Sequence, residues 1–82
     1  MKFPNLDSNQ FAVIMADSHT GVILNVNHEV YKSDSNDSMY TVFENIDSAK
    51  DFIKDIAMIN DRIEFIIYDY KQKTVDFIKA KG

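Results

Sequence analysis

Residues 62–70 read RIEFIIYDY, and the side chains of this stretch divide into two sets. Successive side chains of a β-strand point to opposite faces of the sheet. Ile63, Phe65 and Ile67 therefore share one face, and apolar residues in this alternation are typical of a strand that packs on a core. The other face carries, in order, Arg62, Glu64, Ile66, Tyr68 and Tyr70. The stretch thus predicts a strand whose second face ends in apolar and aromatic side chains that need a cover.

A hairpin is predicted in the first third of the chain. Two β-rich runs, Phe11–Ala16 and Val22–Tyr31, flank a turn in which Asp17 favours the first position and Gly21 can adopt a positive φ. The first run is apolar on both faces, so we expect it to be central in the sheet. The core-facing residues expected in the second run are Val22, Leu24, Val26 and Val30.

A second hairpin is predicted at residues 62–81, with its turn around Lys71–Lys73. We expect Val75 and Phe77 of its last strand to face the core. Ile78 is then expected on the opposite face, beside the apolar and aromatic residues of the preceding strand.

Residues 32–38 predict a polar loop, because Ser, Asn and Asp side chains compete for backbone hydrogen bonds. The same composition invites comparison with a calcium-binding loop. An EF-hand loop starting at Asp34 would need Gly at its sixth position and Glu at its twelfth, where this chain has Met39 and Asn45. The calcium motif therefore does not fit.

A short strand is predicted at residues 39–44, and one amphipathic helix follows it. Apolar residues recur at helical spacing from Ile46 to Ile59. Asn45 suits the N-cap, and Asn60 can end the helix in the left-handed region. The residues expected at the centre of the apolar face are Phe52, Ile53 and Ile56.

These elements follow the order β-β-β-α-β-β, which indicates an α+β fold of two layers. We expect a mostly antiparallel sheet with the amphipathic helix packed on one face. A chain of 82 residues is expected to form a single small domain, residues 1–82, in which residues 1–9 are an N-terminal arm.

Composition and charge narrow the classes of function. The chain has no cysteine, which excludes disulfides and thiolate metal sites. Its net charge of −4 disfavours binding to nucleic-acid phosphates. The charge is uneven, because residues 1–61 have four Lys or Arg against ten Asp or Glu, whereas residues 62–82 have five against three. No run of about 18 apolar residues and no signal peptide is found, so we expect a cytoplasmic location and no membrane partner.

No catalytic, cofactor or metal site is predicted. The chain has two glycines and no Gly-rich phosphate loop. His19 lies in the first turn and His28 far along the return strand, too far apart to share a metal ion within one chain. A pairing of Asp17 with His19 lacks a nucleophile at a recognisable spacing. We therefore expect neither a metal nor a cofactor.

The sheet face away from the helix determines the functional hypothesis. One helix of about 14 residues covers one side of a sheet only, and a contiguous exposed apolar patch usually marks a binding surface. We expect this face to be buried between two copies of the chain in a symmetric homodimer. The candidate interface residues are Ile14, Ile23, Ile66, Tyr68 and Tyr70 on the sheet, and Met58, which interrupts the charged face of the helix.

The leading hypothesis is a small cytoplasmic interaction module, with itself or another protein as its partner and no chemistry of its own. The alternative is a small-ligand binder or enzyme with a pocket at the dimer seam, lined by Tyr68, Tyr70 and His28. Nucleic-acid binding through the C-terminal hairpin is a third hypothesis. A competing account of the uncovered sheet face has the N-terminal arm folding Phe3 and Leu6 across it.

Overall fold

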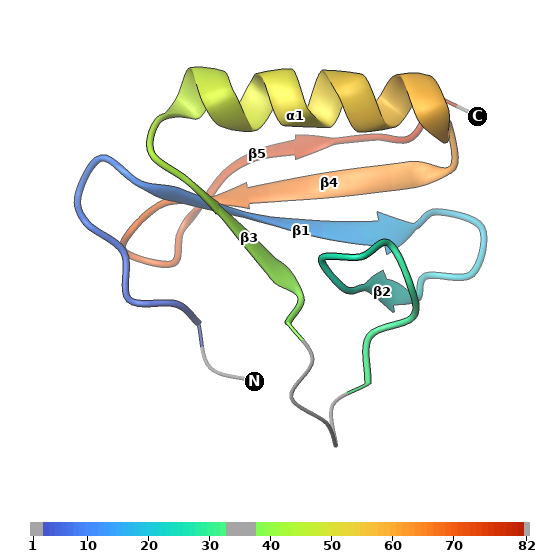
Figure 1. Ribbon diagram of the computed structural model, residues 1–82, viewed down its shortest axis with the longest axis horizontal. Coiled ribbons are helices and arrows are strands. Elements are labelled where there is room, and N and C mark those ends of the chain that lie inside the picture. The colour runs from blue at the N-terminus through green and yellow to red at the C-terminus, as the bar shows by residue number, and fades with distance from the viewer. Residues whose placement is uncertain (1–2, 33–37, 82) are drawn as a thin grey trace.

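The computed structural model describes residues 3–32 and 38–81 of the chain. Its elements are β1 (Phe11–Asp17), β2 (Ile23–Leu24), β3 (Tyr40–Phe43), α1 (Ile46–Ile59), β4 (Ile63–Tyr68) and β5 (Thr74–Ile78). The strands pair in antiparallel fashion, and α1 lies along one face of the sheet that they form (Figure 1). The predicted α+β architecture, with one amphipathic helix on an antiparallel sheet, is confirmed.

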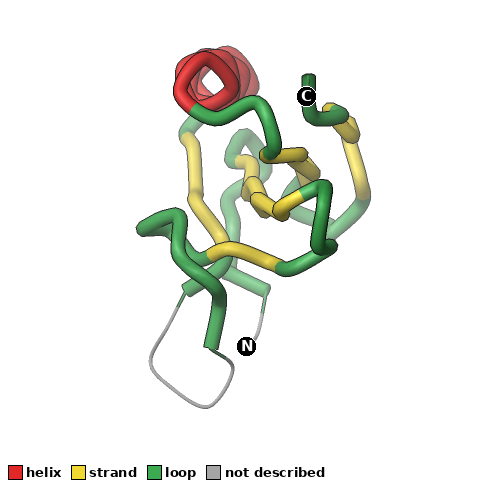
Figure 2. The backbone as a smooth tube through the Cα atoms, turned by 90° about the vertical axis from the view of Figure 1, so that its right-hand side faces the viewer, coloured by secondary structure: helices red, strands yellow, loops and turns green. Residues whose placement is uncertain are grey.

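β1 is the centre of the sheet. One of its edges pairs with β4, and its other edge pairs with β3 over residues 11–14 and then with β2 over residues 15–16. β5 lies outside β4, so the strand order is β2-β1-β4-β5 with β3 beside β1. Residues 12–16 are all buried, as expected of a central strand. The sheet curves around the core, with β3 on one side, β5 on the other and α1 over the concave side (Figure 2).

The hydrophobic core lies between α1 and the concave face of the sheet. Its largest fully buried side chains are Val13 and Met15 of β1 and Phe65 and Ile67 of β4. Ile63, the remaining member of the predicted core face of β4, is buried with them. The alternation of residues 62–70 therefore predicts the buried face of β4 correctly.

The helix contributes Ala49, Ile53 and Ile56 to this core. Ile53 and Ile56 confirm two of the three anchors predicted at the centre of the apolar face. Phe52, the third, is only partly buried, and its ring packs beside that of Phe43 with the two centroids 5.0 Å apart. The centre of the helix contact is thus smaller and more aliphatic than predicted.

An asparagine lies at each end of α1, and the two residues cap the helix in different ways. The side-chain oxygen of Asn45 accepts the backbone N–H of Ser48 at 2.8 Å, which confirms the predicted N-cap. The prediction for Asn60 is wrong, because its backbone is extended (φ −143°) and its side-chain oxygen accepts the N–H of Arg62. The extended conformation leads the chain directly into β4. Ile59, predicted on the apolar face, is exposed in the last turn.

The strand predicted at Val22–Tyr31 is much shorter in the structure, where β2 is limited to Ile23–Leu24. The backbone turns after it, and the side-chain oxygen of Asn25 accepts the N–H groups of Asn27 and Glu29. Local hydrogen bonds of this kind offer the backbone an alternative to the sheet ladder. Of the four core-facing residues expected here only Leu24 is buried, and the exposed ones are Val22, Val26 and Val30.

The two faces of β5 are the reverse of those predicted, because the second hairpin contains a β-bulge. The register shifts by one residue between Ile67 and Tyr68. Such a shift exchanges the faces of every residue beyond it. If the pairing of Tyr68 with Thr74 continued along both strands without the bulge, Phe77 would lie opposite Phe65 on the core face. The sequence pattern predicts this core position for Phe77.

With the bulge, Phe77 pairs with Ile66 and Ile78 pairs with Phe65. Ile78 therefore packs against the core, contrary to the prediction. Phe77 lies on the opposite face of the sheet, and Val75 is the residue that the bulge leaves without a strand partner. Each of the two is 47% exposed. Two residues predicted in the core thus belong to the surface.

The hairpin turns lie where they are predicted. Gly21 has a positive φ of 73° in the first turn. In the second turn, the carboxylate of Asp69 accepts the backbone N–H groups of Lys71 and Lys73 at 2.9 and 3.0 Å. The predicted polar loop at residues 32–38, with the rejected calcium motif, lies largely outside the described residues.

Candidate interaction surface

The sheet face turned away from α1 is called the outer face below. Residues that lie opposite each other on paired strands point to the same side of a sheet, so the registers assign its members. They are Ala12, Ile14, Ala16, Ile23, Tyr40, Val42, Glu64, Ile66, Tyr68, Thr74 and Phe77. Only Glu64 among them carries a charge. Antiparallel sheets with one face in water usually alternate with polar residues on that face, and this sheet does not.

One row of large side chains crosses the outer face from β3 to β5. Ile14 of β1 lies between Tyr40 of β3 and Ile66 of β4, and Ile66 pairs in turn with Phe77 of β5. Ile14 is buried, Tyr40 and Ile66 are half-buried, and Phe77 is exposed. The row is therefore most accessible at β5.

The N-terminal arm covers one half of the outer face. The ring of Phe3 packs edge-on against Tyr40, with centroids 5.2 Å apart, and against Tyr68, with centroids 5.9 Å apart. Tyr40 lies opposite Ile14 and Tyr68 lies opposite Ala12, on the two sides of β1. A ring that contacts both tyrosines must lie across β1. This position explains why β1 is buried on its outer face without a second layer.

The phenol rings under the arm form an aromatic cluster with Phe3. Burial raises the pKa of Tyr40 above its ordinary value of 10.0, and the nearby phenols of Tyr68 and Tyr31 raise it further. The Tyr40 phenol therefore stays uncharged at neutral pH, which suits apolar contact with Phe3 rather than acid–base chemistry.

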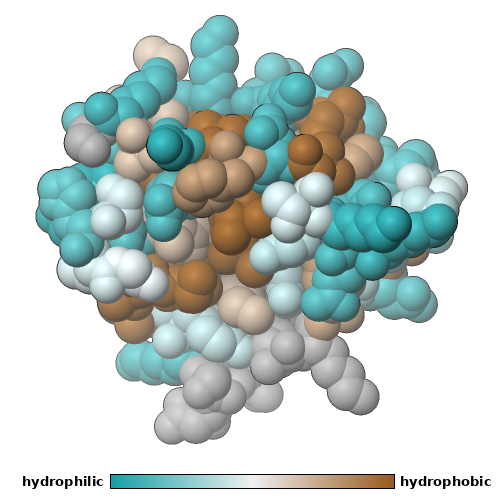
Figure 3. All heavy atoms as spheres, turned by 180° about the vertical axis from the view of Figure 1, so that it is seen from behind, coloured by the Kyte–Doolittle hydropathy of each residue, from teal (hydrophilic) through white to brown (hydrophobic). Residues whose placement is uncertain are grey.

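The other half of the outer face is accessible. We define the β4–β5 patch as Ile66, Val75 and Phe77, which lie beside Tyr68 at the edge of the arm. Figure 3, which views the molecule from the side of β5, shows apolar side chains gathered across the middle of this face with polar side chains around them. Val75 and Phe77 supply the exposed apolar surface, and Ile66 and Tyr68 are half-buried beside them. A contiguous patch with an aromatic component is typical of a docking surface.

The structure brings four of the six predicted interface residues onto the outer face. Ile14 and Ile66 lie directly opposite each other, and Tyr68 and Ile23 share their side of the sheet. His28, predicted with Tyr68 for a ligand pocket, has a positive φ of 65° in the turn after β2. β2 and β4 pair with opposite edges of β1. Within one chain, β1 therefore separates this histidine from the tyrosine.

The other two candidates lie apart from this group. Tyr70 follows β4 and is exposed, with the ammonium group of Lys71 5.6 Å from its ring centre. Met58 is 76% exposed on α1, in the other layer of the fold. Sequence reasoning missed Val75 and Phe77 as surface residues, because only the β-bulge moves Phe77 to the outer face and leaves Val75 without a strand partner. The sequence indicates only that both are apolar residues of a strand, and this does not reveal which face of the sheet they occupy.

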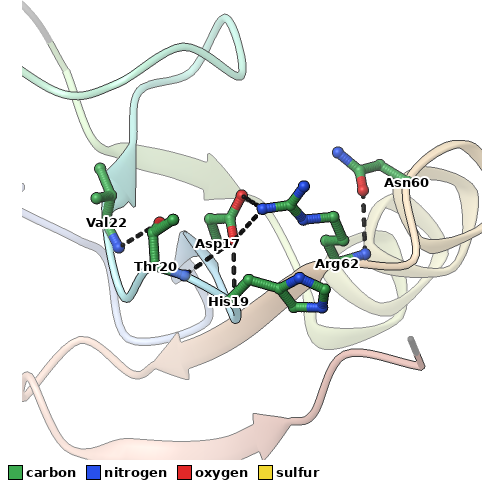
Figure 4. Close-up of polar contacts among 6 residues, drawn as sticks. All are labelled: Asp17, His19, Thr20, Val22, Asn60 and Arg62. Carbon is green, nitrogen blue, oxygen red and sulfur yellow. Dashed lines mark hydrogen bonds and ion pairs between the residues drawn. The ribbon is translucent and has the colours of Figure 1, made fainter.

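A polar cluster at the other end of β1 holds a turn together. The carboxylate of Asp17 accepts the backbone N–H groups of His19 at 2.8 Å and Thr20 at 3.2 Å, and it forms an ion pair with Arg62 at 3.2 Å (Figure 4). The backbone N–H of Ser18 donates to the carbonyl of Arg62 at 2.8 Å. The carboxylate binds the backbone of His19 rather than its ring. The cluster therefore joins the first turn to the start of β4 and has a structural role.

Acid should weaken this turn in a way that depends on Asp17. The backbone N–H of His19 lowers the pKa of Asp17 below its ordinary value of 3.8. Desolvation opposes this shift, and Thr20 and Arg62 lower the pKa further. A carboxylate whose pKa is lowered by folding stabilises the fold above its unfolded-state pKa, and this contribution disappears as pH falls through the folded-state pKa. We expect Asp17→Asn to reduce the pH dependence of the free energy of unfolding below 3.8. Urea denaturation at pH values from about 2 to 7 measures it, and identical pH slopes for parent and variant would contradict the assignment.

Within residues 3–32 and 38–81, no three His, Asp or Glu side chains lie close enough together to hold a metal ion. The same part of the chain contains no helix with the length and apolar character needed to cross a membrane. Comparisons with family models, curated proteins and solved structures give no match for this chain. The functional argument therefore depends on the geometry of the outer face.

Proposed function

We propose that this protein is a small interaction module that forms a homodimer through its β4–β5 patch. The observation that carries the proposal is the 47% exposure of Phe77 on the outer face and of Val75 at the bulge beside it, where neither α1 nor the arm covers β5. Burial of apolar surface is the dominant favourable term in most protein association. Two patches placed face to face would remove these side chains from water in both chains.

The border of the β4–β5 patch carries several basic residues. Lysines border the patch at both ends of the hairpin, at positions Lys71, Lys73, Lys79 and Lys81. Residues 62–82 have five basic against three acidic residues, whereas residues 1–61 have four against ten. Two patches placed face to face bring these basic borders together, so burial of the apolar side chains supplies the attraction between the two copies.

Stacking through the face is favoured over extension of the sheet at its edge. β5 is the last strand of the sheet, and the carboxylate of Asp76 accepts the backbone N–H of Phe77 at 2.9 Å. Two β5 strands paired antiparallel around this position would place two Asp76 side chains together, and opposed like charges destabilise a strand pair. A charged residue that blocks its own strand edge is a common protection against edge-to-edge pairing.

Cross-linking through a single introduced cysteine tests this arrangement. The chain has no cysteine, so Val75→Cys places one thiol in the patch. Two sites held together in a complex have an effective concentration of about 1 millimolar, against about 10 micromolar for free chains at that protein concentration. We expect a short bis-maleimide to produce covalent dimer from Val75→Cys about 100-fold faster than random collision allows.

Lys50→Cys is the matched control, because Lys50 is exposed on α1 in the other layer of the fold. Its cross-linking should proceed at the rate of random collision. Equal rates for the two variants would show that the patch does not face a second copy, and would leave another protein as its occupant.

A further inference from the structure

The arm is fixed firmly at one end only. At residues 7–10, the backbone N–H of Gln10 donates to the carbonyl of Asp7 at 2.9 Å and closes a turn. The side-chain amides of Asn9 and Gln10 donate to the carbonyl and the carboxylate of Glu44 at 3.2 and 3.0 Å. Residues 3–6 make no hydrogen bond to the described part of the sheet. Phe3 therefore holds the free end of the arm by its contacts with tyrosine rings.

We infer that the arm is a reversible strap that restricts self-association to the β4–β5 patch, an inference that rests on the homodimer proposed above. Sheets that stack face to face lie about 10 Å apart, with side chains of both faces filling the space. The Phe3 ring across β1 already occupies that space. A second sheet cannot approach β1 or β3 while the ring is in place.

Release of Phe3 would enlarge the docking surface in one step. It would uncover Tyr40 and Ile14, which continue the row formed by Ile66 and Phe77. The accessible part of the outer face would then extend from β3 to β5. The strap would thus set how much of this face a second copy can use.

The first test measures whether Phe3 covers its half of the face. The rate of tyrosine nitration reports how accessible each phenol is to the reagent. The protein is used at about 1 micromolar, because a chain whose Kd for dimerisation is above this value is then mostly monomeric. We expect Phe3→Ala to increase the nitration rate of Tyr40 severalfold and to leave that of Tyr70 unchanged. Asn5→Ala is the matched control, because Asn5 is an exposed residue of the same arm. Equal Tyr40 rates in the two variants would show that Phe3 is not a cover.

The second test measures the Kd of the homodimer by sedimentation equilibrium. We expect Phe3→Ala to dimerise about tenfold more tightly than Asn5→Ala, because the uncovered part of the outer face adds contact area to the interface; a tenfold change corresponds to about 1.4 kcal/mol. An unchanged or weaker dimer would show that the arm is not a restriction on association. If parent and variants are all monomeric, the homodimer itself is wrong, and the restricting role of the arm is wrong with it. A Tyr40 rate that rises together with a weaker dimer would instead assign Phe3 to the interface.

Discussion

Replacing Phe65 with Ala is expected to lower the free energy of unfolding by about 3–5 kcal/mol. Phe65 is 1% exposed and is one of the largest fully buried side chains, so its removal leaves a cavity between α1 and the sheet. A domain of this size has a total stability of about 4–12 kcal/mol, and the substitution would therefore leave the fold marginal. Urea denaturation followed by circular dichroism measures the change in midpoint.

Phe52→Ala is the matched control for this prediction. Phe52 is only partly buried and packs against Phe43 at the edge of the core. We expect it to cost about 1–2 kcal/mol, because less apolar surface leaves water there. If Phe65→Ala does not fold, Phe65→Leu should still show a loss of about 1 kcal/mol. An equal loss for Phe52→Ala and Phe65→Ala would contradict the position of the core.

Short-range patterns were sufficient to predict the framework of the fold. The alternation of Ile63, Phe65 and Ile67 identifies the buried face of β4, and helical spacing with Asn45 as N-cap identifies α1. These signals are local, because the period of a strand or helix and the chemistry of a cap lie within a few residues. The α+β arrangement follows from the order of the elements.

Features that depend on a single local deviation could not be predicted in this way. The bulge beside Tyr68 reverses the face of Phe77 and leaves Val75 without a strand partner, although a regular register would place both residues on the core face. The side-chain hydrogen bonds of Asn25 end β2 early, in a run that alternates like a longer strand. The bulge determines which face of the sheet a β5 side chain occupies, and the Asn25 hydrogen bonds determine the length of β2. Neither feature changes the hydrophobic pattern of the sequence.

The candidate surface was predicted in part for the same reason. Ile66 and Tyr68 are recognisable from the second face of residues 62–70, and Ile14 lies opposite Ile66 as expected. The cover that Phe3 provides is a contact between distant parts of the chain, and nothing in the local pattern of the arm indicates its target. The division of the outer face into a covered and an accessible half therefore appears only in the structure.

Replacing Phe77 with Lys is expected to abolish the homodimer at micromolar concentrations. Aromatic residues at the centre of an interface commonly contribute about 2 kcal/mol or more, which corresponds to a change in Kd of about 30-fold. A buried unpaired ammonium group adds a desolvation cost in the dimer. Because Phe77 is 47% exposed in the single chain, the substitution should leave the fold itself largely intact. Circular dichroism checks the fold, and sedimentation checks the association.

Met58→Lys is the control for this second prediction. Met58 is a large apolar residue that is 76% exposed, but it lies on α1 rather than on the outer face. It should leave the Kd unchanged, although the sequence pattern alone names it as an interface candidate. A dimer lost equally in Met58→Lys and Phe77→Lys would move the interface away from the β4–β5 patch.

Sedimentation equilibrium of the parent chain tests the proposed homodimer most directly. Measurements from about 1 to 100 micromolar span the range in which a dimer with a micromolar Kd forms. The account predicts a mass that rises from that of one 9.5 kDa chain towards twice that value. A mass that stays at 9.5 kDa throughout the range would contradict it.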